Sequence, residues 1–485
     1  MNTRIRHGGI RSVALLLVMV LVTGCSLPSP QEQETMEDVP DKEQQHPVNY
    51  KVPISVPNIL VDQNGYEMKS TKTALFRGEN LQKTFEVIDA DSGETVYTGD
   101  IITRGIDEKT GEYISYGAFS ELEKVGTYYI QTAVIGQSYR FVIEENMYTD
   151  LIYKMETALS ENRDKVDIAD ETSGGWNTDS GRNKNVTVGC TVAQTLLLTN
   201  EFYPEIMTDD VGTVDSGNQI PDILDEVKYE MDWLLKMQNP KTGGVYAGIT
   251  RGKLQPESVE ATADFASAMA LFYYNYVYYD KAYAQRCLQM AERAWKYLQV
   301  NATTDTALAQ YNAAAQLFKA TYNVTYHTYI KEHYDAVYHE EDNKWNRELY
   351  GDVAYLTTVR KVDTNICKML MDKWMDKAED IVEESKKNSY FVIEDTNEEM
   401  LSEMLCLSVI DHVITNHEYV TVLEGHLHYF MGRNTDAVCY IEEYGKVYPS
   451  RNHKQEALTK QSQQTATLLF MLSEIITEDT EEFGE

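Results

Sequence analysis

The sequence predicts a β-sandwich module followed by a larger all-α domain. Between about residues 53 and 146, short segments alternate apolar and polar side chains, a period typical of strands that pack on one face. From residue 147 onward, apolar residues recur every three or four positions, as they do along one face of a helix. About twelve such segments follow one another, each long enough to be stable when it is packed.

The amino terminus predicts export and lipid anchoring. Three arginines precede an apolar run from Val13 to Val22, which is too short to span a bilayer and is typical of a signal peptide. The run leads to Gly24-Cys25, which resembles the lipobox of a bacterial lipoprotein signal. In this interpretation residues 1–25 are the signal, Cys25 carries the lipid, and residues 26–52 form a flexible tether rich in Pro, Gln, Glu and Asp. The expected location is extracytoplasmic, on the bacterial cell membrane or surface; the alternative is an ordinary secretory signal with an incidental cysteine.

The charge balance of the chain limits the kinds of partner that it can bind. The chain has 43 Lys and Arg against 77 Asp and Glu, a net charge of -34 that opposes binding to nucleic acid and to anionic lipid surfaces. We therefore expect no nucleic acid partner, and membrane contact only through the lipid on Cys25. A neutral polysaccharide would not be repelled, although solubility alone explains the acidity equally well.

The cysteines give no sign of a disulfide framework. Of the 6 cysteines, those other than Cys25 are widely spaced and lie mostly in apolar helical patterns, and no Cys-x-x-Cys pair occurs. We interpret them as small core residues and expect no structural zinc site.

Two hairpins can be recognised in the first module. Residues 85–89 and 95–97 alternate in polarity on either side of an Asp-Ser-Gly-Glu turn, and residues 126–134 and 138–143 form a second pair. A sandwich of about seven short strands fits this length. We expect the module to brace the helical domain; a carbohydrate-binding role is the alternative.

The helical domain follows from apolar periodicity. Its expected helices lie near Leu151–Leu159, Val192–Phe202, Ile223–Met237, Phe265–Tyr279, Tyr283–Leu298, Ala307–Tyr322, Tyr326–Tyr338, Leu349–Val359, Ile366–Val382, Met400–Ile414, Val420–Met431 and Ala466–Ile476.

Residues 173–184 carry a motif that suggests a function. They read Ser-Gly-Gly-Trp-Asn-Thr-Asp-Ser-Gly-Arg-Asn-Lys. This stretch resembles the Gly-Gly-Trp-x-Asp-Ala-Gly-Asp loop of glycoside hydrolase family 9, the cellulase family. In that family the second Asp is the general base that activates water, and the first helps to hold the water. The resemblance implies a β-1,4-glucan, or a related plant polysaccharide, as the partner.

Further segments extend the resemblance over nearly all of the chain after about residue 55. Residues 220–238 and 243–246 are similar to the family's long helix and the turn after it, and residues 261–270 to its next helix. Residues 428–434 look like the segment that leads into the substrate cleft, and residues 59–66 like the first strand of an immunoglobulin-like module. The implied architecture is an immunoglobulin-like β-sandwich at 53–146 and an (α/α)6 toroid of the six-hairpin glycosidase type at 147–480.

The catalytic positions of the loop depart from the family. Aligned without a gap, Thr178 and Gly181 stand where the family has its two Asp residues, and neither can accept a proton from water near neutral pH. An insertion after Trp176 would place Asp179 and Gly181 on the first half of the pattern. Arg182 would then stand at the base position, where it cannot act as a base.

The acid position departs as well. The family's general acid is a Glu in an Asn-Glu-Val-Ala sequence, and Thr459 stands there in this chain. Glu456, about one helical turn earlier, is the nearest carboxylate. The family's sugar-gripping Pro-His-His-Arg segment is reduced to a remnant that contains Arg451 and His453.

Aromatic side chains supply the remaining substrate-binding candidates, because sugar rings stack their CH faces on Trp and Tyr. We expect Trp176 to stack on a sugar or pack the loop, with Tyr246, Tyr429 and Tyr440 as further candidates. Arg433 is a candidate through the resemblance of its segment to the cleft.

No cofactor is expected. Asp209, Asp210 and Asp215 could hold calcium, which some relatives bind, but their spacing is not that of a calcium loop. His426 and His428 are two positions apart on a helix and do not face one ligand, so we expect satisfied core or surface histidines.

Three functions are compatible with these observations. The first is a monomeric surface lipoprotein that engages β-glucan and is weakly active or non-catalytic. The second is an active inverting endo-β-1,4-glucanase with displaced carboxylates, Asp179 near the water and Glu456 as the acid. A third, a structural surface protein without a glycan, fits the retained motifs less well. Further carboxylates that could supply a rearranged pair are Asp170, Glu171, Glu442 and Glu443.

Overall fold

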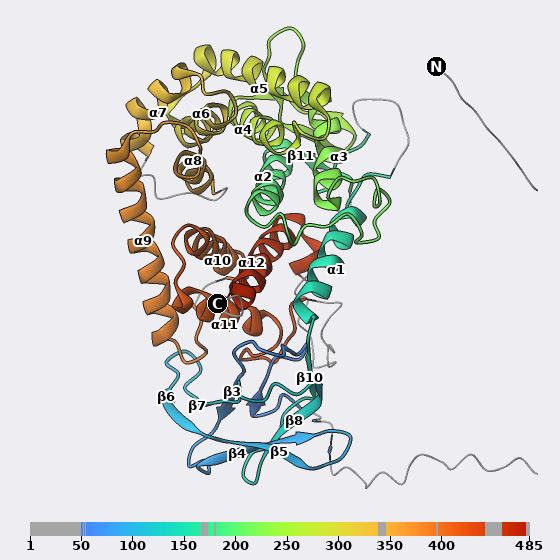
Figure 1. Cartoon of the computed structure of the whole chain (residues 1–485), viewed down its shortest axis with the longest axis vertical. Coiled ribbons are helices and arrows are strands. Elements are labelled where there is room, and N and C mark those ends of the chain that lie inside the picture. Colours follow the sequence, from blue (N-terminus) through green and yellow to red (C-terminus); the bar gives the residue numbers. More distant parts are fainter. Residues whose placement is uncertain are drawn as a thin grey trace, which may run out of the picture. The chain divides into compact units, whose positions relative to one another are not determined.

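The computed structural model describes residues 50, 51, 53, 55–165, 173–178, 181–337, 346–393, 396–441 and 458–481. All of them belong to one compact unit, residues 46–485. Strands occupy the first part of this unit and helices the rest, as the sequence predicts (Figure 1).

The first module is a sandwich of two sheets. One sheet has the strand order β1-β3-β7-β6, and the other β2-β10-β8-β4-β5, with β9 paired to β8. Both predicted hairpins are confirmed, since β4 pairs with β5 and β8 with β9 and β10, all antiparallel. The strands are β1 (Ile59–Leu60), β2 (Tyr66–Glu67), β3 (Thr73–Arg77), β4 (Thr84–Asp89), β5 (Thr95–Asp100), β6 (Ile102–Ile106), β7 (Tyr113–Ala118), β8 (Gly126–Thr132), β9 (Gly136–Gln137) and β10 (Phe141–Glu144).

Aromatic rings fill the space between the two sheets. Phe85 is fully buried, and it lies against two strand glycines, Gly99 and Gly117. A Cβ atom on Gly117 would stand 2.4 Å from the Phe85 ring, so no larger residue fits there without displacing the ring. Tyr66 packs edge-on against Phe141, with the ring centroids 5.3 Å apart. The alternating pattern of the sequence therefore does place its apolar residues in a shared core.

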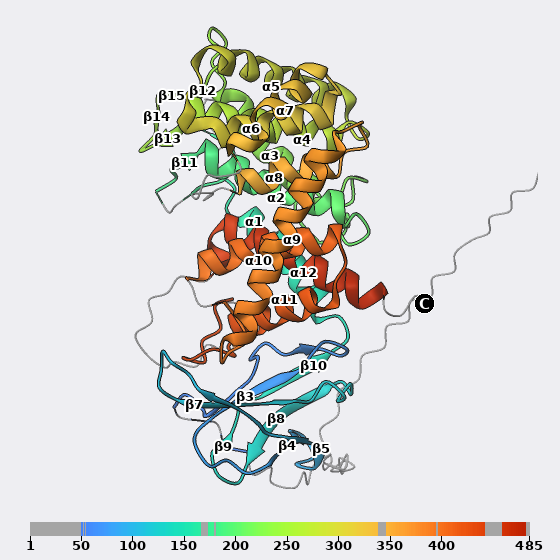
Figure 2. The same ribbon diagram turned by 90° about the vertical axis from the view of Figure 1, so that its left-hand side faces the viewer.

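The helical domain contains twelve α-helices within the described ranges. Helices α2, α4, α6 and α8 pack in succession, and α10 packs on α12, which returns to α2 (Figures 1 and 2). Helix α4 begins at Val259, before the predicted start, because the Ser258 side chain caps it by accepting the N–H of Ala261. The helices are α1 (Met147–Glu161), α2 (Val186–Phe202), α3 (Asp222–Met237), α4 (Val259–Tyr276), α5 (Lys281–Asn301), α6 (Ala307–Thr321), α7 (Val324–Val337), α8 (Arg347–Leu356), α9 (Thr364–Lys387), α10 (Asn397–Val413), α11 (His417–Phe430) and α12 (Ser462–Glu481).

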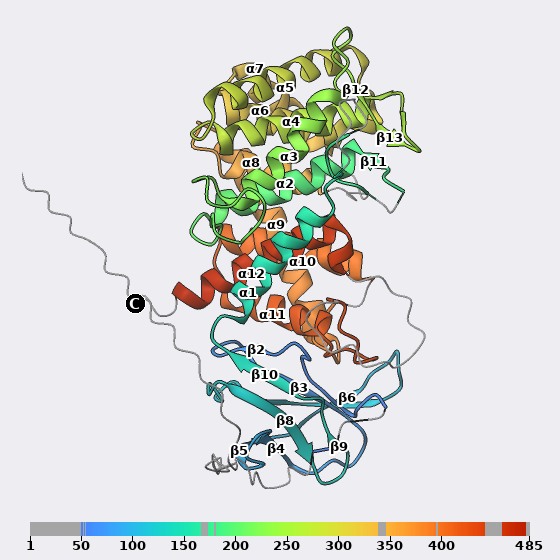
Figure 3. The same ribbon diagram turned by 90° about the vertical axis from the view of Figure 1, so that its right-hand side faces the viewer.

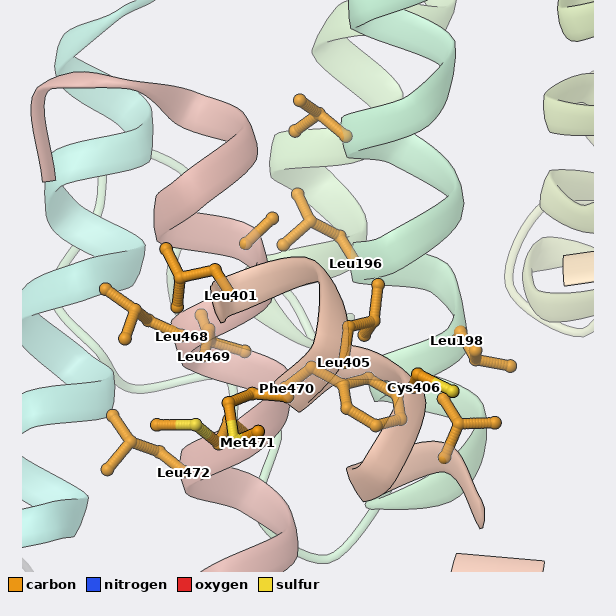
Figure 4. Close-up of a cluster of buried hydrophobic side chains, with 14 of the residues drawn as sticks. Leu196, Leu198, Leu401, Leu405, Cys406, Leu468, Leu469, Phe470, Met471 and Leu472 are labelled. Carbon is orange, nitrogen blue, oxygen red and sulfur yellow. The ribbon is translucent and has the colours of Figure 1, made fainter. Parts of the chain in front are cut away.

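Helices α2, α10 and α12 share an apolar core (Figure 4). Four of the cysteines that the structure describes are buried, as expected, and Cys406 lies in this core. None of the helices in the described ranges combines the length and apolarity needed to cross a membrane. The labelled side chains in the figure are Leu196 and Leu198 of α2, Leu401, Leu405 and Cys406 of α10, and Leu468, Leu469, Phe470, Met471 and Leu472 of α12.

The sandwich is hydrogen-bonded to the last part of the helical domain, which Figure 3 shows beside it. The Gln63 backbone N–H donates to the Met431 carbonyl at 2.9 Å, and the Gln63 side-chain amide donates to the Ala437 carbonyl at 2.6 Å. His428 of α11 contacts Asp62 with Nδ1 at 2.8 Å and the Thr71 carbonyl with Nε2 at 3.0 Å. These bonds support the expectation that the first module braces the second.

Arg433 belongs to the same junction. Its side chain donates to the Gly425 carbonyl at 3.0 Å and to the Thr73 carbonyl at 3.4 Å, and only 3% of the residue is exposed. The predicted substrate-binding role of Arg433 is therefore replaced by a structural one, because its guanidinium is buried between the two modules.

Candidate functional site

The motif loop connects α1 to α2 and is anchored by Trp176. Only 3% of Trp176 is exposed. Its backbone N–H donates to the Glu230 carboxylate at 2.7 Å, and its indole Nε1–H donates to the Glu226 carboxylate. The prediction that Trp176 stacks on a sugar is therefore corrected in favour of its alternative, loop packing, because the ring is covered by protein.

The two glycines before Trp176 allow the loop to lie directly on α3. Gly175 has a φ of +72°, and a Cβ atom there would stand 2.8 Å from the Trp233 ring. On the facing helix α2, a Cβ atom on Gly189 would stand 2.2 Å from a Glu230 oxygen. The Gly-Gly-Trp part of the motif is thus retained for close packing.

An ion-pair cluster fixes the base of the loop. Asp164, which follows α1, lies 2.6 Å from the Lys184 ammonium and 2.6 Å from the Arg182 guanidinium. The side chains of Asp164 and Lys184 are each only 1% exposed, whereas that of Arg182 is 46% exposed. The Tyr229 hydroxyl also donates to the Asp164 carbonyl at 2.7 Å. Because the Asp164 carboxylate is paired with two cations, it is not placed to activate water.

Thr178 and Gly181 are both exposed at the outer end of this loop. The Thr178 N–H and its hydroxyl both donate to the Asn183 carbonyl, at 2.8 and 2.9 Å. Neither residue carries a group that takes up a proton near neutral pH. The two positions predicted to correspond to the family's Asp residues are therefore without carboxylates.

The acid position lies near this loop. Thr459 is in a short 3-10 turn, η2 (Leu458–Lys460), directly before α12. The Asn162 side chain donates to Ser462 Oγ at 3.0 Å, and the Asn162 carbonyl accepts the Asn177 N–H at 2.9 Å. Asn162 thus links the motif loop to the beginning of α12.

Two tyrosines lie beside η2. The Leu458 N–H donates to the Tyr440 carbonyl at 2.9 Å, and the Tyr440 ring stacks on Tyr429 with centroids 6.5 Å apart and planes inclined by 24°. Both rings are partly exposed. Burial, and to a smaller extent Tyr429, raises the pKa of the Tyr440 hydroxyl, so it stays protonated at neutral pH. Tyr246 lies on β12 (Val245–Tyr246), which pairs with β15 (Glu257–Ser258) ahead of α4.

The buried carboxylates beneath the loop are features that sequence reasoning did not single out. Burial raises the pKa of Glu230 to about 8, against the smaller effects of the Trp176 N–H and Lys184. Burial also raises the pKa of Glu226, which the Arg163 guanidinium opposes. The sequence did contain a signal that could have identified them, because they are two glutamates four residues apart on an apolar helix face.

A second ionic cluster joins the beginnings of α2, α4 and α8. Arg347 donates to Asp264 at 2.8 Å and to Glu260 at 2.8 Å, and the Thr187 hydroxyl donates to Asp264 at 2.8 Å. Asp264 is buried, which raises its pKa, and Arg347 opposes that effect. This cluster was also not predicted from the sequence.

Several predicted site residues fall outside the described ranges, so their roles remain predictions. These are Cys25, Asp170, Glu171, Asp179, Glu442, Glu443, Arg451, His453 and Glu456.

Two of the three calcium candidates, Asp209 and Asp215, have protein partners. The Asp209 carboxylate accepts the N–H groups of Gly217 at 2.6 Å and Asn218 at 3.3 Å, and Asp215 pairs with Arg163 at 2.9 Å. Within the ranges that the structure describes, no group of three or more His, Cys, Asp and Glu residues is arranged to hold a metal ion.

Comparison with known proteins gives matches over both modules. The model described as glycosyl hydrolase family 9 matches residues 145–478, and that described as cellulase N-terminal ig-like domain matches residues 55–137. Endoglucanase D of Acetivibrio thermocellus is 25% identical over 449 residues, covering 77% of this chain and 71% of the relative. A cellodextrinase of Butyrivibrio fibrisolvens is 26% identical over 475 residues, covering 80% and 85%.

Solved structures confirm the fold. A metagenome-derived family 9 endoglucanase superposes with a TM-score of 0.76 at 22% identity, covering 86% of this chain and 98% of that one. The family 9 protein of Bacteroides ovatus superposes with a TM-score of 0.74 at 17% identity, covering 87% and 99%. The expected immunoglobulin-like sandwich and (α/α)6 toroid are thereby confirmed.

Proposed function

The chain belongs to glycosyl hydrolase family 9, and we propose that it engages β-1,4-glucan or a related plant polysaccharide with little or no hydrolysis. The observation that carries this proposal is the pairing of two degenerate segments at one place. Thr178 and Gly181 lie on the motif loop, Thr459 lies just before α12, and Asn162 bonds the two segments together.

Inverting hydrolysis needs two carboxyl groups on opposite faces of the scissile bond. One protonates the departing oxygen and the other activates water, at a separation of roughly 6.5 to 9.5 Å. Positioned acid or base catalysis is worth on the order of 10² to 10⁴ in rate for each group. The described carboxylates near the loop are engaged elsewhere, since Asp164 pairs with Lys184 and Arg182, and Glu226 pairs with Arg163.

The tyrosines beside η2 support retained glycan binding. Tyr429 and Tyr440 form a partly exposed aromatic pair next to Thr459, and aromatic faces stack on the CH faces of sugars. The relatives support the glycan class: their names describe an endoglucanase, a cellodextrinase and a xyloglucan-specific endo-beta-1,4-glucanase.

An active inverting endo-β-1,4-glucanase is the second candidate. It is favoured by the names of the relatives and by two carboxylates of the sequence, Asp179 and Glu456, which would replace the missing base and acid. The proposed location is the same for both candidate functions. We propose that the protein is a monomer held on the cell surface by a lipid on Cys25.

A paired assay distinguishes the two candidates. Protein beginning at Ser26 is tested for reducing-end release from, and pull-down on, swollen cellulose, mixed-linkage glucan and xylan. We expect pull-down without release above the blank. Release that is lost in Asp179→Ala but kept in the exposed sandwich variant Asp91→Ala would instead establish the active enzyme. Absence of both release and pull-down would contradict both candidates.

A further inference from the structure

Glu156 of α1 is a buried acid that has no hydrogen-bond partner in the described part of the chain. Only 3% of the residue is exposed, and neither of its carboxylate oxygens is hydrogen-bonded. An ionised carboxylate in such a place would be costly, because burial removes its water without supplying a replacement. Nothing in the proposed glycan site uses this residue.

The charges that act on Glu156 come from α3 and have the same sign. They belong to Asp222 and Glu226. Glu226 pairs with Arg163 at 2.8 Å and accepts the Trp176 indole N–H. Arg163 also pairs with Asp215, so this cation is already shared by two carboxylates. Asp222 accepts backbone and hydroxyl donors from the loop ahead of α3.

The other elements packed on α1 contribute further titratable groups. Strand β2 contributes Glu67, whose carboxylate accepts the N–H of Tyr148 at the first turn of α1. The η2 turn contributes Lys460. Helix α12 contributes Glu474, which accepts the Tyr203 hydroxyl. The charges that act on Glu156 are nevertheless the two on α3.

Ionisation of Glu156 would therefore place three carboxylates between α1 and α3. The repulsion among these carboxylates is relieved if the two helices separate. That movement disturbs Glu226 of α3, which accepts the indole N–H of Trp176. The protonation state of one residue on α1 is in this way coupled to the anchor of the motif loop.

We propose that Glu156 is a pH-sensitive latch, which keeps α1, α3 and Trp176 together while it is neutral and loosens the motif loop when it ionises. Burial is the main reason that the pKa of Glu156 is raised to about 8, with Asp222 and Glu226 adding to it. Because the closed state binds the proton more tightly than the open state, whose pKa is near the ordinary 4.5, closure weakens as the pH rises from there to about 8 and changes no further above it.

The test follows the loop directly, by hydrogen exchange of the amides of residues 173–178 and by tryptophan fluorescence from about pH 6 to 10. In the wild type we expect protection of the Trp176 amide, beyond the intrinsic pH effect, to fall by at least about tenfold between pH 6 and 8 and to level off above about pH 8. In Glu156→Gln this transition should be absent. Glu161→Gln, an exposed position on the same helix, should keep it.

Two further variants serve as controls. Glu156→Met has no ionisable group and a similar length, so it repeats the test if Glu156→Gln folds poorly. Glu230→Gln removes the acid that accepts the Trp176 N–H and whose pKa is also about 8, so this variant gives the contribution of Glu230 itself; a fall in protection due to Glu156 should remain in it. A wild type without a transition, or an unchanged transition in both Glu156 variants, would overturn the latch.

Discussion

The side chain of Asn162 donates a hydrogen bond to Ser462 Oγ at 3.0 Å, and this contact joins the motif loop to the start of α12. In the family that the chain resembles, these two segments carry the general base and the general acid. The Asn162 carbonyl also accepts the Asn177 N–H, so the loop that holds Thr178 and Gly181 is linked to the start of α12, which follows Thr459. None of these three residues carries a carboxylate.

The buried pair between Asp164 and Lys184 should dominate the stability of the loop. Replacing Asp164 with Asn leaves a buried ammonium without its counter-charge, so we expect unfolding free energy to fall by about 3 to 5 kcal/mol. Arg182→Gln is the matched control, because this guanidinium is half exposed and should matter by less than about 1 kcal/mol. Urea unfolding followed by tryptophan fluorescence measures both; equal losses would contradict the burial argument.

Substitutions of Trp176 and Tyr440 should affect different properties. The first should lower the stability of the fold, and the second should lower the affinity for glycan. Trp176→Phe keeps an aromatic ring but loses the N–H bonded to Glu226, which should cost about 1 to 3 kcal/mol of stability and leave glycan affinity within about twofold. Tyr440→Ala removes one ring of the exposed pair and should weaken affinity by roughly fivefold. Isothermal titration with a soluble glucan provides the affinities. A larger affinity loss for a folded Trp176→Phe would show that the indole contacts the sugar.

The contact between Asp62 and His428 should couple the unfolding of the two modules. Asp62→Ala leaves Nδ1 of the buried His428 imidazole without its partner, while Nε2 keeps the Thr71 carbonyl, and we expect unfolding free energy to fall by about 1 to 3 kcal/mol. Calorimetry should show one transition for the wild type and two for the variant, with Asp91→Ala as a sandwich control that behaves like the wild type. Two transitions in the wild type would argue against a fixed brace.

Glu230 should make stability depend on pH. Its pKa is about 8 in the folded protein and near 4.5 in a model peptide, so the folded state binds more protons between these values. Stability therefore falls as the pH rises through this interval, by at most about 1.4 kcal/mol per pH unit from this group. Glu230→Gln keeps an acceptor for the Trp176 N–H and should gain stability relative to the wild type from pH 5 to 8. A constant difference between the two proteins would contradict this assignment.

Local patterns were sufficient for much of the fold. Alternation around Phe85 predicted the β4–β5 hairpin, and apolar periodicity predicted a helix that the structure places at Asp222–Met237. That Thr178 and Thr459 carry no carboxylate could also be read directly, whereas their correspondence to the family's catalytic positions stays a prediction.

Contacts between distant segments could not be read in the same way. Trp176 and Arg433 looked like ligand-binding residues, yet each is buried, one on Glu226 and the other against Thr73. Their burial depends on partners tens to hundreds of positions away, and periodicity carries no information about such pairs. Glu156 was missed for the same reason, because a lone glutamate on an amphipathic helix is usually exposed.

Introducing carboxylates at the three substituted positions would show whether their absence limits hydrolysis. The measurement is reducing-end release from mixed-linkage glucan by the wild type and by the triple variant Thr178→Asp, Gly181→Asp, Thr459→Glu, with pull-down confirming that both bind. We expect release at the blank for the wild type and at least about tenfold above it for the variant. Wild-type release well above the blank that is abolished by Asp179→Ala would contradict the account and make this chain an active glucanase.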